Sequence, residues 1–208
     1  IGEVKRALKV GIPSYKIIFS GVGKRDDEIK QALEFDILMI NVESEAELNR
    51  VEEIAKNLGK VARISIRLNP NIDPKTHPYI STGLHENKFG VDIDTAKRMY
   101  IHCKNSESLE PTGIHCHIGS QLTQLQPIKD AIKIVADLVR NLKAIKIDLS
   151  FMDVGGGLGI VYKDEVLIDT YEYTQSILDV MFGLDLTVIC EPGRFIVGNS
   201  GVFVTKVL

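Results

Sequence analysis

Residues 149–159 read Leu-Ser-Phe-Met-Asp-Val-Gly-Gly-Gly-Leu-Gly, a mainly apolar run that leads directly into four glycines within five positions. Glycine loses more backbone freedom on folding than any other residue, so a cluster of glycines needs a structural reason. A tight turn accounts for one or two of them. A loop with bare amide N–H groups at the end of a strand accounts for all four, because such a loop cradles a phosphate or a carboxylate.

The alternation of strand and helix continues in both directions from this stretch. Strands are predicted at 17–20, 37–42, 61–68, 112–118, 147–154 and 186–191. Helices are predicted at 3–10, 26–34, 44–59, 93–104, 126–143 and 167–182. Apolar strands spaced by helices favour a parallel sheet that is buried on both faces. An open doubly wound sheet and a (β/α) barrel both fit this pattern, and a closed barrel needs two strands more than these six.

Composition excludes several classes of protein. The chain has 208 residues, 44% of them hydrophobic, and a net charge of −3, so we expect neither nucleic acid nor an anionic membrane as a partner. No apolar stretch approaches the roughly 18 residues of a membrane span. The three cysteines, Cys103, Cys116 and Cys190, suit reduced, buried thiols in a cytoplasmic protein. The chain opens without methionine and closes on the strand-like run 202–208, so we expect it to be part of a longer protein.

Polar residues and glycines gather just beyond four of the predicted strands. The four clusters are Arg67; His115, His117 and Ser120; Gly155, Gly156, Gly157 and Gly159; and Glu191, Pro192, Gly193 and Arg194. In either parallel architecture the carboxyl ends of the strands share one rim, where loops build the active site. We therefore expect the four clusters to form one site.

Common nucleotide motifs do not explain the glycines. The dinucleotide fingerprint counted from Gly155 requires a glycine where Ile160 stands, and no Gly-Lys-Ser/Thr follows. The earlier stretch 21–24, Gly-Val-Gly-Lys, is followed by Arg25 where a phosphate loop requires a hydroxyl. A nucleotide-binding oxidoreductase is disfavoured for the same reason.

The histidine pair leaves several uses open. On a strand, His115 and His117 point the same way and could bind zinc, but no third ligand is spaced nearby, so we expect no metal site. A satisfied core histidine is one alternative. A histidine that faces a cofactor ring, with Ser120 bound to an anion, fits the rim better.

Glu191 directly follows an apolar strand, and a buried carboxylate needs a partner. Arg194 is one candidate for that partner. Alternatively Glu191 faces a protonated heterocycle while the Gly193 amide faces an anion. A phosphate, a ring to stack against and a basic ring nitrogen together describe pyridoxal 5′-phosphate (PLP), whose ring withdraws electrons from a developing carbanion.

Six stretches carry a family resemblance. They are 67–70 (Arg-Leu-Asn-Pro), 77–83 (His-Pro-Tyr-Ile-Ser-Thr-Gly), 88–90 (Lys-Phe-Gly), 117–121 (His-Ile-Gly-Ser-Gln), 155–159 (Gly-Gly-Gly-Leu-Gly) and 191–194 (Glu-Pro-Gly-Arg). In these stretches the sequence resembles the diaminopimelate decarboxylases, which belong to the alanine-racemase-like, fold-type-III PLP enzymes. The stretch at 77–83 ahead of 88–90 favours this branch over the ornithine and arginine decarboxylases.

The resemblance implies roles for individual residues. The cofactor contacts fall on His117, Ser120, Gly155, Gly156, Gly157, Glu191, Pro192, Gly193 and Arg194. Of these, His117 stacks on the ring and Glu191 meets the pyridine nitrogen, and these two are the expected catalytic residues. Arg194 meets a substrate carboxylate, and Arg67 belongs to the same pocket near Glu191 or the ring oxygen.

The resemblance also implies an activity and an architecture. The family removes carbon dioxide from meso-diaminopimelate to give L-lysine, and its members are homodimers. Residues 1–198 would form strands three to eight of an alanine-racemase-type (β/α)8 TIM barrel, and residues 199–208 would begin a C-terminal β-domain. No Tyr-Ala-x-Lys-Ala-like stretch with the family's Schiff-base lysine occurs here, so we expect this chain alone to be inactive. The alternatives are a decarboxylase of arginine, ornithine or carboxynorspermidine, and a non-catalytic PLP-binding protein.

Overall fold

The computed structural model describes residues 1–72 and 89–206. These residues form one six-stranded sheet in which the strands lie in the order β1-β2-β3-β4-β5-β6 and each neighbouring pair is parallel. The strands are β1 (Ile18–Phe19), β2 (Met39–Val42), β3 (Ala62–Arg67), β4 (Leu109–His115), β5 (Phe151–Asp153) and β6 (Thr187–Ile189). The helices are α1 (Gly2–Lys9), α2 (Asp26–Glu34), α3 (Glu45–Leu58), α4 (Ile93–Asn105), α5 (Leu125–Ala144), α6 (Thr170–Met181) and α7 (Gly193–Val197), with a 3-10 turn η1 (Ser14–Lys16).

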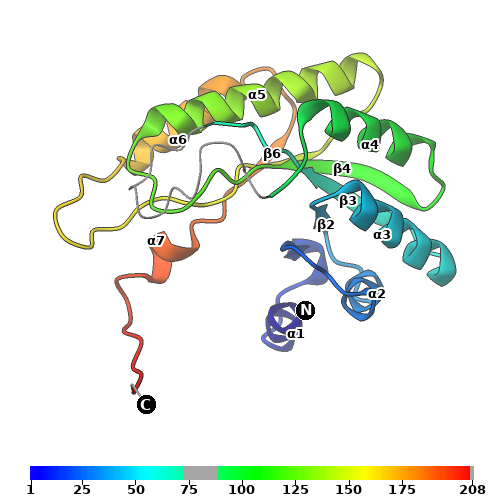
Figure 1. The fold of residues 1–208 in the computed structure, drawn as a ribbon, viewed down its shortest axis with the longest axis horizontal. Coiled ribbons are helices and arrows are strands. Elements are labelled where there is room, and N and C mark those ends of the chain that lie inside the picture. The colour runs from blue at the N-terminus through cyan, green and yellow to red at the C-terminus, as the bar shows by residue number, and fades with distance from the viewer. Residues whose placement is uncertain (73–88, 207–208) are drawn as a thin grey trace.

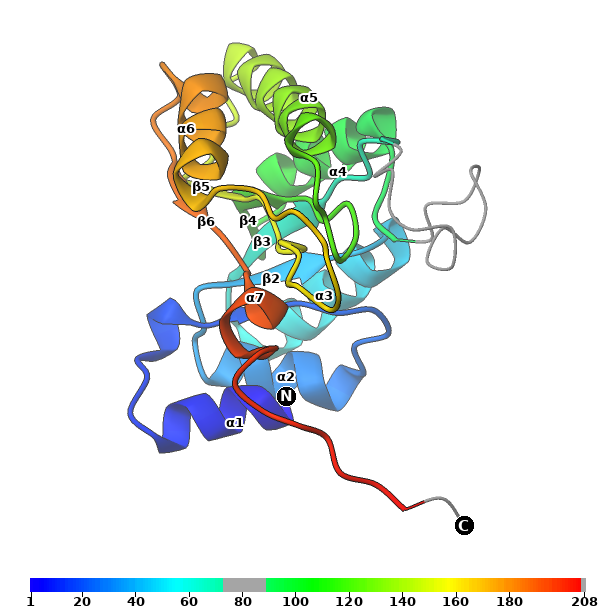
Figure 2. The ribbon, with the colours of Figure 1, turned by 90° about the vertical axis from the view of Figure 1, so that its left-hand side faces the viewer.

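The six strands and the helices α1 to α6 follow the predicted order, and the sheet is curled with helices along its outer side (Figures 1 and 2). A parallel, sequentially ordered and curled sheet of this kind is an arc of a (β/α) barrel, so the α/β barrel prediction is confirmed over the doubly wound alternative. None of the helices in the described ranges has the length and apolar character needed to cross a membrane.

Local sequence signals explain where the helices begin and end. The Ser44 side chain accepts a hydrogen bond from the Glu47 amide at the start of α3, and Gly59 ends that helix in a left-handed conformation with φ of 62°. The Glu47 carboxylate accepts from the Glu43 amide and not from Ser44, so the capping box is not closed at Ser44 itself. Helix α2 begins at Asp26, and Arg25 holds its cap position.

The inner face of the sheet is polar, whereas the sequence predicted strands that are buried and apolar on both faces. In β3 the polar residues Arg63, Ser65 and Arg67 alternate with apolar ones, so they share one face. Residues paired in register across parallel strands also share a face. Ser65 pairs with Asn41 and with Gly113, and Arg67 pairs with His115, which pairs in turn with Asp153. The inner face therefore carries a buried polar layer that leads toward the carboxyl ends of the strands.

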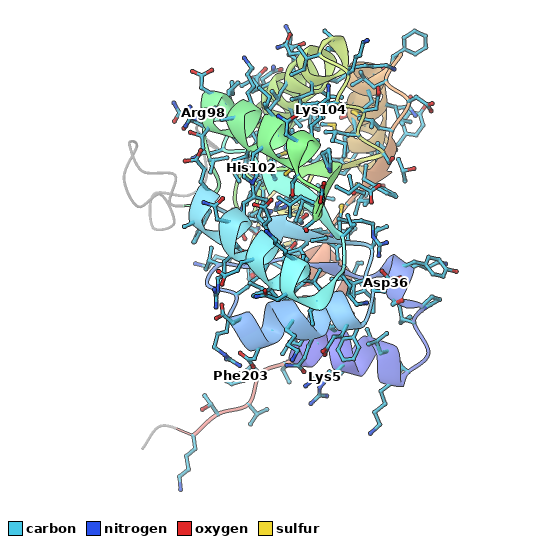
Figure 3. All side chains as sticks on the ribbon, turned by 90° about the vertical axis from the view of Figure 1, so that its right-hand side faces the viewer. Lys5, Asp36, Arg98, His102, Lys104 and Phe203 are labelled. Carbon is cyan, nitrogen blue, oxygen red and sulfur yellow. The ribbon has the colours of Figure 1, made fainter. Side chains whose placement is uncertain are left out.

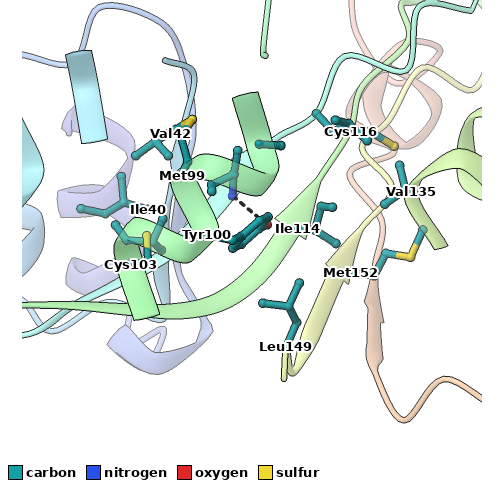
Figure 4. Packing of buried hydrophobic residues seen from close by; sticks show 14 of the residues in the cluster. Ile40, Val42, Met99, Tyr100, Cys103, Ile114, Cys116, Val135, Leu149 and Met152 are labelled. Carbon is teal, nitrogen blue, oxygen red and sulfur yellow. Dashed lines mark hydrogen bonds between the residues drawn. The ribbon is translucent and has the colours of Figure 1, made fainter. Parts of the chain in front are cut away.

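The opposite face of the sheet packs against the helices in an apolar core (Figure 4). Tyr100 of α4 is wholly buried there. Its hydroxyl donates to the Gly113 carbonyl at 2.6 Å and accepts from the Ile66 amide at 3.4 Å. One side chain thus ties α4 to both β3 and β4.

Two strand boundaries differ from prediction in a way that affects the site. β4 ends at His115, so His117 lies in the loop beyond the strand and the two histidines do not share a strand face. β6 lies at one edge of the sheet, and its residues are only partly buried. Cys190, which follows it, is therefore exposed where a buried thiol was predicted. Burial of Cys103 and Cys116 is confirmed.

The predicted strand at 202–208 is not formed in the described residues 201–206. These residues make no strand pairing, and Phe203 is 93% exposed on a tail that leaves the body of the chain (Figure 3). A strand needs a partner for its backbone N–H and C=O groups, and the described part of the chain offers none at this position. The domain boundary at residue 198 stays a prediction.

Candidate functional site

The inner polar layer ends at the rim formed by the loops after β3, β4, β5 and β6. Arg67, His115 and Asp153 stand at the last positions of three neighbouring strands and lie in register. Glu191 follows the fourth strand, and its carboxylate comes within 3.8 Å of the His115 Nε2 atom. The rim therefore brings together residues that are more than a hundred positions apart in the sequence, as predicted.

At the glycine loop, residues 155–159 after β5, the backbone lies in contact with the loops after β4 and β6. A Cβ atom on Gly155 would lie 2.4 Å from the Cys116 carbonyl oxygen, and one on Gly156 would lie 2.1 Å from the Glu191 carbonyl oxygen. A Cβ atom on Gly157 would lie 2.1 Å from the Gly119 carbonyl oxygen. Because carbonyl oxygens of neighbouring loops occupy these places, the glycines serve first to let the loops pack together.

Most of the amides that were predicted to face an anion have acceptors inside the chain. Gly155 donates to the Asp153 carboxylate at 2.9 Å and Gly156 donates to His117 Nδ1 at 3.2 Å. Gly193 donates to the Glu191 carbonyl at 2.8 Å. The Gly157 amide has no acceptor within the described ranges, and it therefore remains available to a ligand.

Ser120 lies in the loop that approaches Gly157. The Gly119 carbonyl is the oxygen that would meet a Cβ atom on Gly157, so Ser120 is adjacent in sequence to this contact. Ser120 is half-buried, and its hydroxyl makes no hydrogen bond within the described part of the chain. The predicted partnership of Ser120 and the glycine loop is thus supported by their proximity.

The His117 ring is held in one orientation. Its Nδ1 atom accepts the Gly156 amide proton, so in the neutral ring the proton resides on Nε2. Burial lowers the pKa of His117, and the nearby Arg67 cation lowers it further. The structure therefore presents a neutral, half-buried imidazole at the rim, and its Nδ1 atom is not free to bind a metal.

Two carboxylates, Glu191 and Asp153, lie close to His115 and have pKa values shifted in opposite directions. His115 holds the pKa of Glu191 below its usual value, against the opposing effect of burial. Burial raises the pKa of Asp153 to about 6, although His115 counteracts this rise. Asp153 also accepts from the Gly155 amide and, at 3.4 Å, from the Asn41 side chain. The structure thus keeps the Glu191 carboxylate ionised at the rim, with the buried Asp153 carboxyl group next to it.

Arg67 forms an ion pair that the sequence did not indicate. Its guanidinium donates to the Glu43 carboxylate at 2.6 Å, and both side chains are nearly buried. The Gly90 amide donates to the other Glu43 oxygen at 3.1 Å, and the Phe89 ring lies 5.2 Å from the Arg67 guanidinium carbon. Arg67 therefore faces the pocket, where it influences His117, but its ion-pair partner is Glu43 and not Glu191.

Arg194 is also not the partner of Glu191. It lies in α7, the short helix that begins at Gly193 after Pro192 and that was not predicted. Its side chain is exposed and forms no ion pair with another described residue. The alternative in which Arg194 neutralises Glu191 is therefore wrong, and His115 occupies that place.

Sequence reasoning missed Asp153, Glu43 and Asn41 as members of the site. Asp153 had a signal, because an acidic residue closes an otherwise apolar strand there. Glu43 had a weaker signal, since it follows the buried strand β2 directly. The predicted motif stretch 77–83 and Lys88 lie outside the described residues; Phe89 and Gly90 of the same motif adjoin Arg67.

Comparison with known proteins agrees with this geometry. Residues 1–198 match the model of a family described as pyridoxal-dependent decarboxylase, pyridoxal binding domain. The chain belongs to the pyridoxal-dependent decarboxylase family. The resemblance drawn from the six sequence stretches is thereby confirmed at the level of the family, and a pyridoxal-binding role is the family's defining property.

Individual members of this decarboxylase family are closely similar to the chain. A diaminopimelate decarboxylase from Campylobacter jejuni is 63% identical over the whole chain. The structure of diaminopimelate decarboxylase from Helicobacter pylori, complexed with L-lysine, aligns with 94% of the chain at a TM-score of 0.90 and 58% identity. A lysine/ornithine decarboxylase from Vibrio vulnificus, at 23% identity and a TM-score of 0.75, shows the shared fold.

The chain spans about half the length of these relatives. It covers 52% of the Campylobacter protein and 50% of the Helicobacter structure. The Schiff-base lysine predicted to be absent is not tested by the described residues. Lys24, which follows β1, donates to the Gly21 and Asn41 carbonyls and to the Glu47 carboxylate, each at 2.6 Å, so its ammonium group serves to join these loops.

Proposed function

We propose that this chain is the cofactor-binding part of a diaminopimelate decarboxylase, which converts meso-diaminopimelate to L-lysine and carbon dioxide. The observation that carries the proposal is that Gly156 joins the loops of His117 and Glu191 at the rim: its amide donates to His117 Nδ1 at 3.2 Å, and a Cβ atom on it would lie 2.1 Å from the Glu191 carbonyl oxygen. High identity to proteins named diaminopimelate decarboxylase supports the choice of substrate. The product named in the Helicobacter structure, L-lysine, is consistent with the same reaction.

The residues at the rim fit PLP. The Gly157 amide and the Ser120 hydroxyl are donors without a partner among the described residues, and they lie on touching loops, which suits a phosphate. The exposed Arg194 side chain and the Gly193 backbone stand at the start of α7, at the same rim. In our proposal the phosphate binds between these loops. Gly155 and Gly156 support the cradle through their close packing, and Pro192 starts the turn that presents Gly193.

Two side chains of this chain would act directly on the bound cofactor. The His117 ring would lie against the PLP ring and hold it in place, and its neutral form would avoid a second cation beside the pyridinium. Glu191 would accept the pyridine N–H and keep that proton on the ring. When bound, PLP supplies the electron sink for the carbanion left after carbon dioxide departs.

The substrate and assembly are further parts of the proposal. Arg194 binds a substrate carboxylate, since it is a cation at the rim without an ion-pair partner in the described residues. Arg67 shapes the pocket beside His117 while Glu43 neutralises it. We also propose a homodimer, which the family resemblance implies, and a cytoplasmic location, which suits the reduced cysteines.

The test is a substrate panel on the full-length gene product loaded with PLP. Release of carbon dioxide is measured with meso-diaminopimelate, L-ornithine, L-arginine and carboxynorspermidine, in the wild type and in the Glu191→Gln variant. We expect release from meso-diaminopimelate alone and a large loss of kcat in the variant. Preference for another substrate would identify a different decarboxylase. PLP binding without release from any substrate would identify a non-catalytic binding protein.

A further inference from the structure

His115 is a buried polar side chain without a hydrogen-bond partner. It is 3% exposed, and neither ring nitrogen has a partner among the described residues. A buried imidazole in this state costs free energy unless an electrostatic interaction compensates it. The Glu191 carboxylate, 3.8 Å from Nε2, is one such interaction, and Asp153 belongs to the same group of ligand atoms, all within 4.8 Å of one another.

The arginines near this group do not offset the charge of Glu191. Arg67, the neighbour of His115 in register, is bound to Glu43 at 2.6 Å. Arg194 is exposed and is not paired with Glu191. The remaining titratable groups near the cluster are His117, whose ring is neutral, the thiols of Cys116 and Cys190, and the Tyr173 hydroxyl, and none of these is a cation. His115 is therefore the side chain positioned to offset the charge of Glu191.

We propose that His115 is a positioning residue whose Nε2–H holds the Glu191 carboxylate ionised and turned toward the pyridine nitrogen of PLP. This inference rests on the proposed function, because it assigns Glu191 to the cofactor. His115 itself does not touch the cofactor in this scheme. It acts through Glu191, and Asp153 stands beside it at the end of β5, the strand between those of His115 and Glu191.

The arrangement of the strands explains why a histidine can do this. His115 is the last residue of β4, and Asp153 is its register partner at the end of β5, so the sheet fixes both side chains. Glu191 lies one strand further, in the loop after β6. The Glu191 amide donates to the Gly155 carbonyl at 2.8 Å. Gly156 packs against the Glu191 carbonyl on the same loop. Glu191 is thus held by its backbone, and His115 determines where its side chain points.

A divalent metal is the competing explanation for the same three residues. One histidine and two carboxylates are a common ligand set, and their atoms are close enough to converge on an ion. The cluster already has a balanced arrangement without an ion, however, because Asp153 is occupied by the Gly155 amide and by Asn41. We therefore favour the positioning role and make metal binding an outcome of the test.

The test compares His115→Asn with His102→Asn in the full-length gene product. His102 is a matched control, since its Nε2 atom meets the Glu52 carboxylate at 2.7 Å on the exposed outer side of α4 (Figure 3). The first readout is the pKa of Glu191, followed by carboxyl carbon NMR in the protein without PLP. We expect it to rise in His115→Asn and to stay unchanged in His102→Asn.

Two readouts with PLP bound connect the effect to the cofactor. In His115→Asn we expect kcat to fall about tenfold while KM changes less than about twofold, because the interaction matters when the ring withdraws electrons. The pH dependence of the visible absorbance of bound PLP should shift in the same variant. Unchanged values of the Glu191 pKa, kcat and absorbance would overturn the proposal.

Two further measurements keep the proposal testable if His115→Asn fails to fold. Nitrogen NMR of the wild-type protein should place a proton on His115 Nε2, and an Nε2 atom without a proton would contradict the proposal. Added Zn²⁺ should leave the His115 signals unchanged, and stoichiometric binding there would favour the metal site. A shifted Glu191 pKa in a protein that does not bind PLP would sink the proposed function and leave the link between His115 and Glu191 intact.

Discussion

The packing of the glycine loop can be tested with four alanine substitutions that separate two physical effects. Gly156 and Gly193 lack a positive φ angle, whereas Gly157 and Gly183 have φ angles of 103° and 78°. A Cβ atom would collide with a neighbouring carbonyl at Gly156 and Gly157 but would meet nothing within 4 Å at Gly183 and Gly193. The four sites therefore cover every combination of strained backbone and steric collision.

The expected losses of stability follow from these two terms. Alanine in a left-handed conformation costs about 1–2 kcal/mol, which we expect at Gly183. A Cβ atom 2.1 Å from a backbone oxygen forces the loops apart, and such overpacking costs about 1–3 kcal/mol, which we expect at Gly156. Gly157 carries both effects, so we expect about 2–5 kcal/mol there. Gly193→Ala should be within about 0.5 kcal/mol of the wild type.

The assay is guanidinium unfolding of the chain, followed by far-ultraviolet circular dichroism at one low protein concentration. The predicted order of midpoints is Gly193→Ala highest, then Gly183→Ala, Gly156→Ala and Gly157→Ala. If Gly156→Ala and Gly157→Ala unfold together with Gly193→Ala, the loops do not touch as the structure has them. In that case the glycines would serve the ligand alone.

Four further predictions concern the core, the buried charges and the sheet edges. Tyr100→Phe should lower the free energy of unfolding by about 1–2 kcal/mol, because it leaves the Gly113 carbonyl without its hydroxyl donor; chemical denaturation measures this, and an unchanged midpoint would refute it. Glu43→Ala should cost about 3 kcal/mol in the same assay, since it leaves the Arg67 guanidinium buried and unpaired, and a loss below about 1 kcal/mol would show that water reaches the pair. The pKa of Asp153 is raised in the fold to about 6, so the stability that its protonated form contributes is complete below about pH 4 and is lost as the pH rises through about 6. The Asp153→Asn variant should therefore show a melting temperature that depends less on pH across this window. An unaltered pH profile of the melting temperature would contradict the assignment. Finally, β1 and β6 each pair on one side only within the described residues, so the chain by itself should self-associate, and a monodisperse monomer in analytical ultracentrifugation would argue against this.

Hydrophobic periodicity was sufficient to predict the order of strands and helices. α3 shows why, since a capping serine, an apolar stripe and a closing glycine all specify the same boundaries. β4 shows the limit of this approach. Its first half contains Pro111, which lacks the N–H that a strand ladder uses, so the start of the strand was placed too late. In the folded sheet, a shift in the pairing of β3 with β4 between Ile64 and Ser65 accommodates this proline. Such a shift depends on the neighbouring strand and cannot be read from the sequence of β4.

Site residues were predictable where a strand end and an unusual residue coincide. Glu191 and His117 stood out for this reason, and the structure brings their loops together. Partners were not predictable, because they depend on which strands become neighbours. Glu191 faces His115 across two strand ends, and Arg67 turns to Glu43 on the other side. The alternation in β3 was the overlooked signal that one face of the sheet is polar.

The central claim is that this rim holds PLP with Glu191 at the ring nitrogen and the glycine loop at the phosphate. A crystal structure of the full-length gene product with PLP tests it directly. We predict that a Glu191 carboxylate oxygen lies about 2.7–3.0 Å from the pyridine nitrogen, with the phosphate within hydrogen-bonding distance of the Gly157 amide and the Ser120 hydroxyl. A ring nitrogen that faces another side chain, or a phosphate bound away from residues 155–157, would contradict the account.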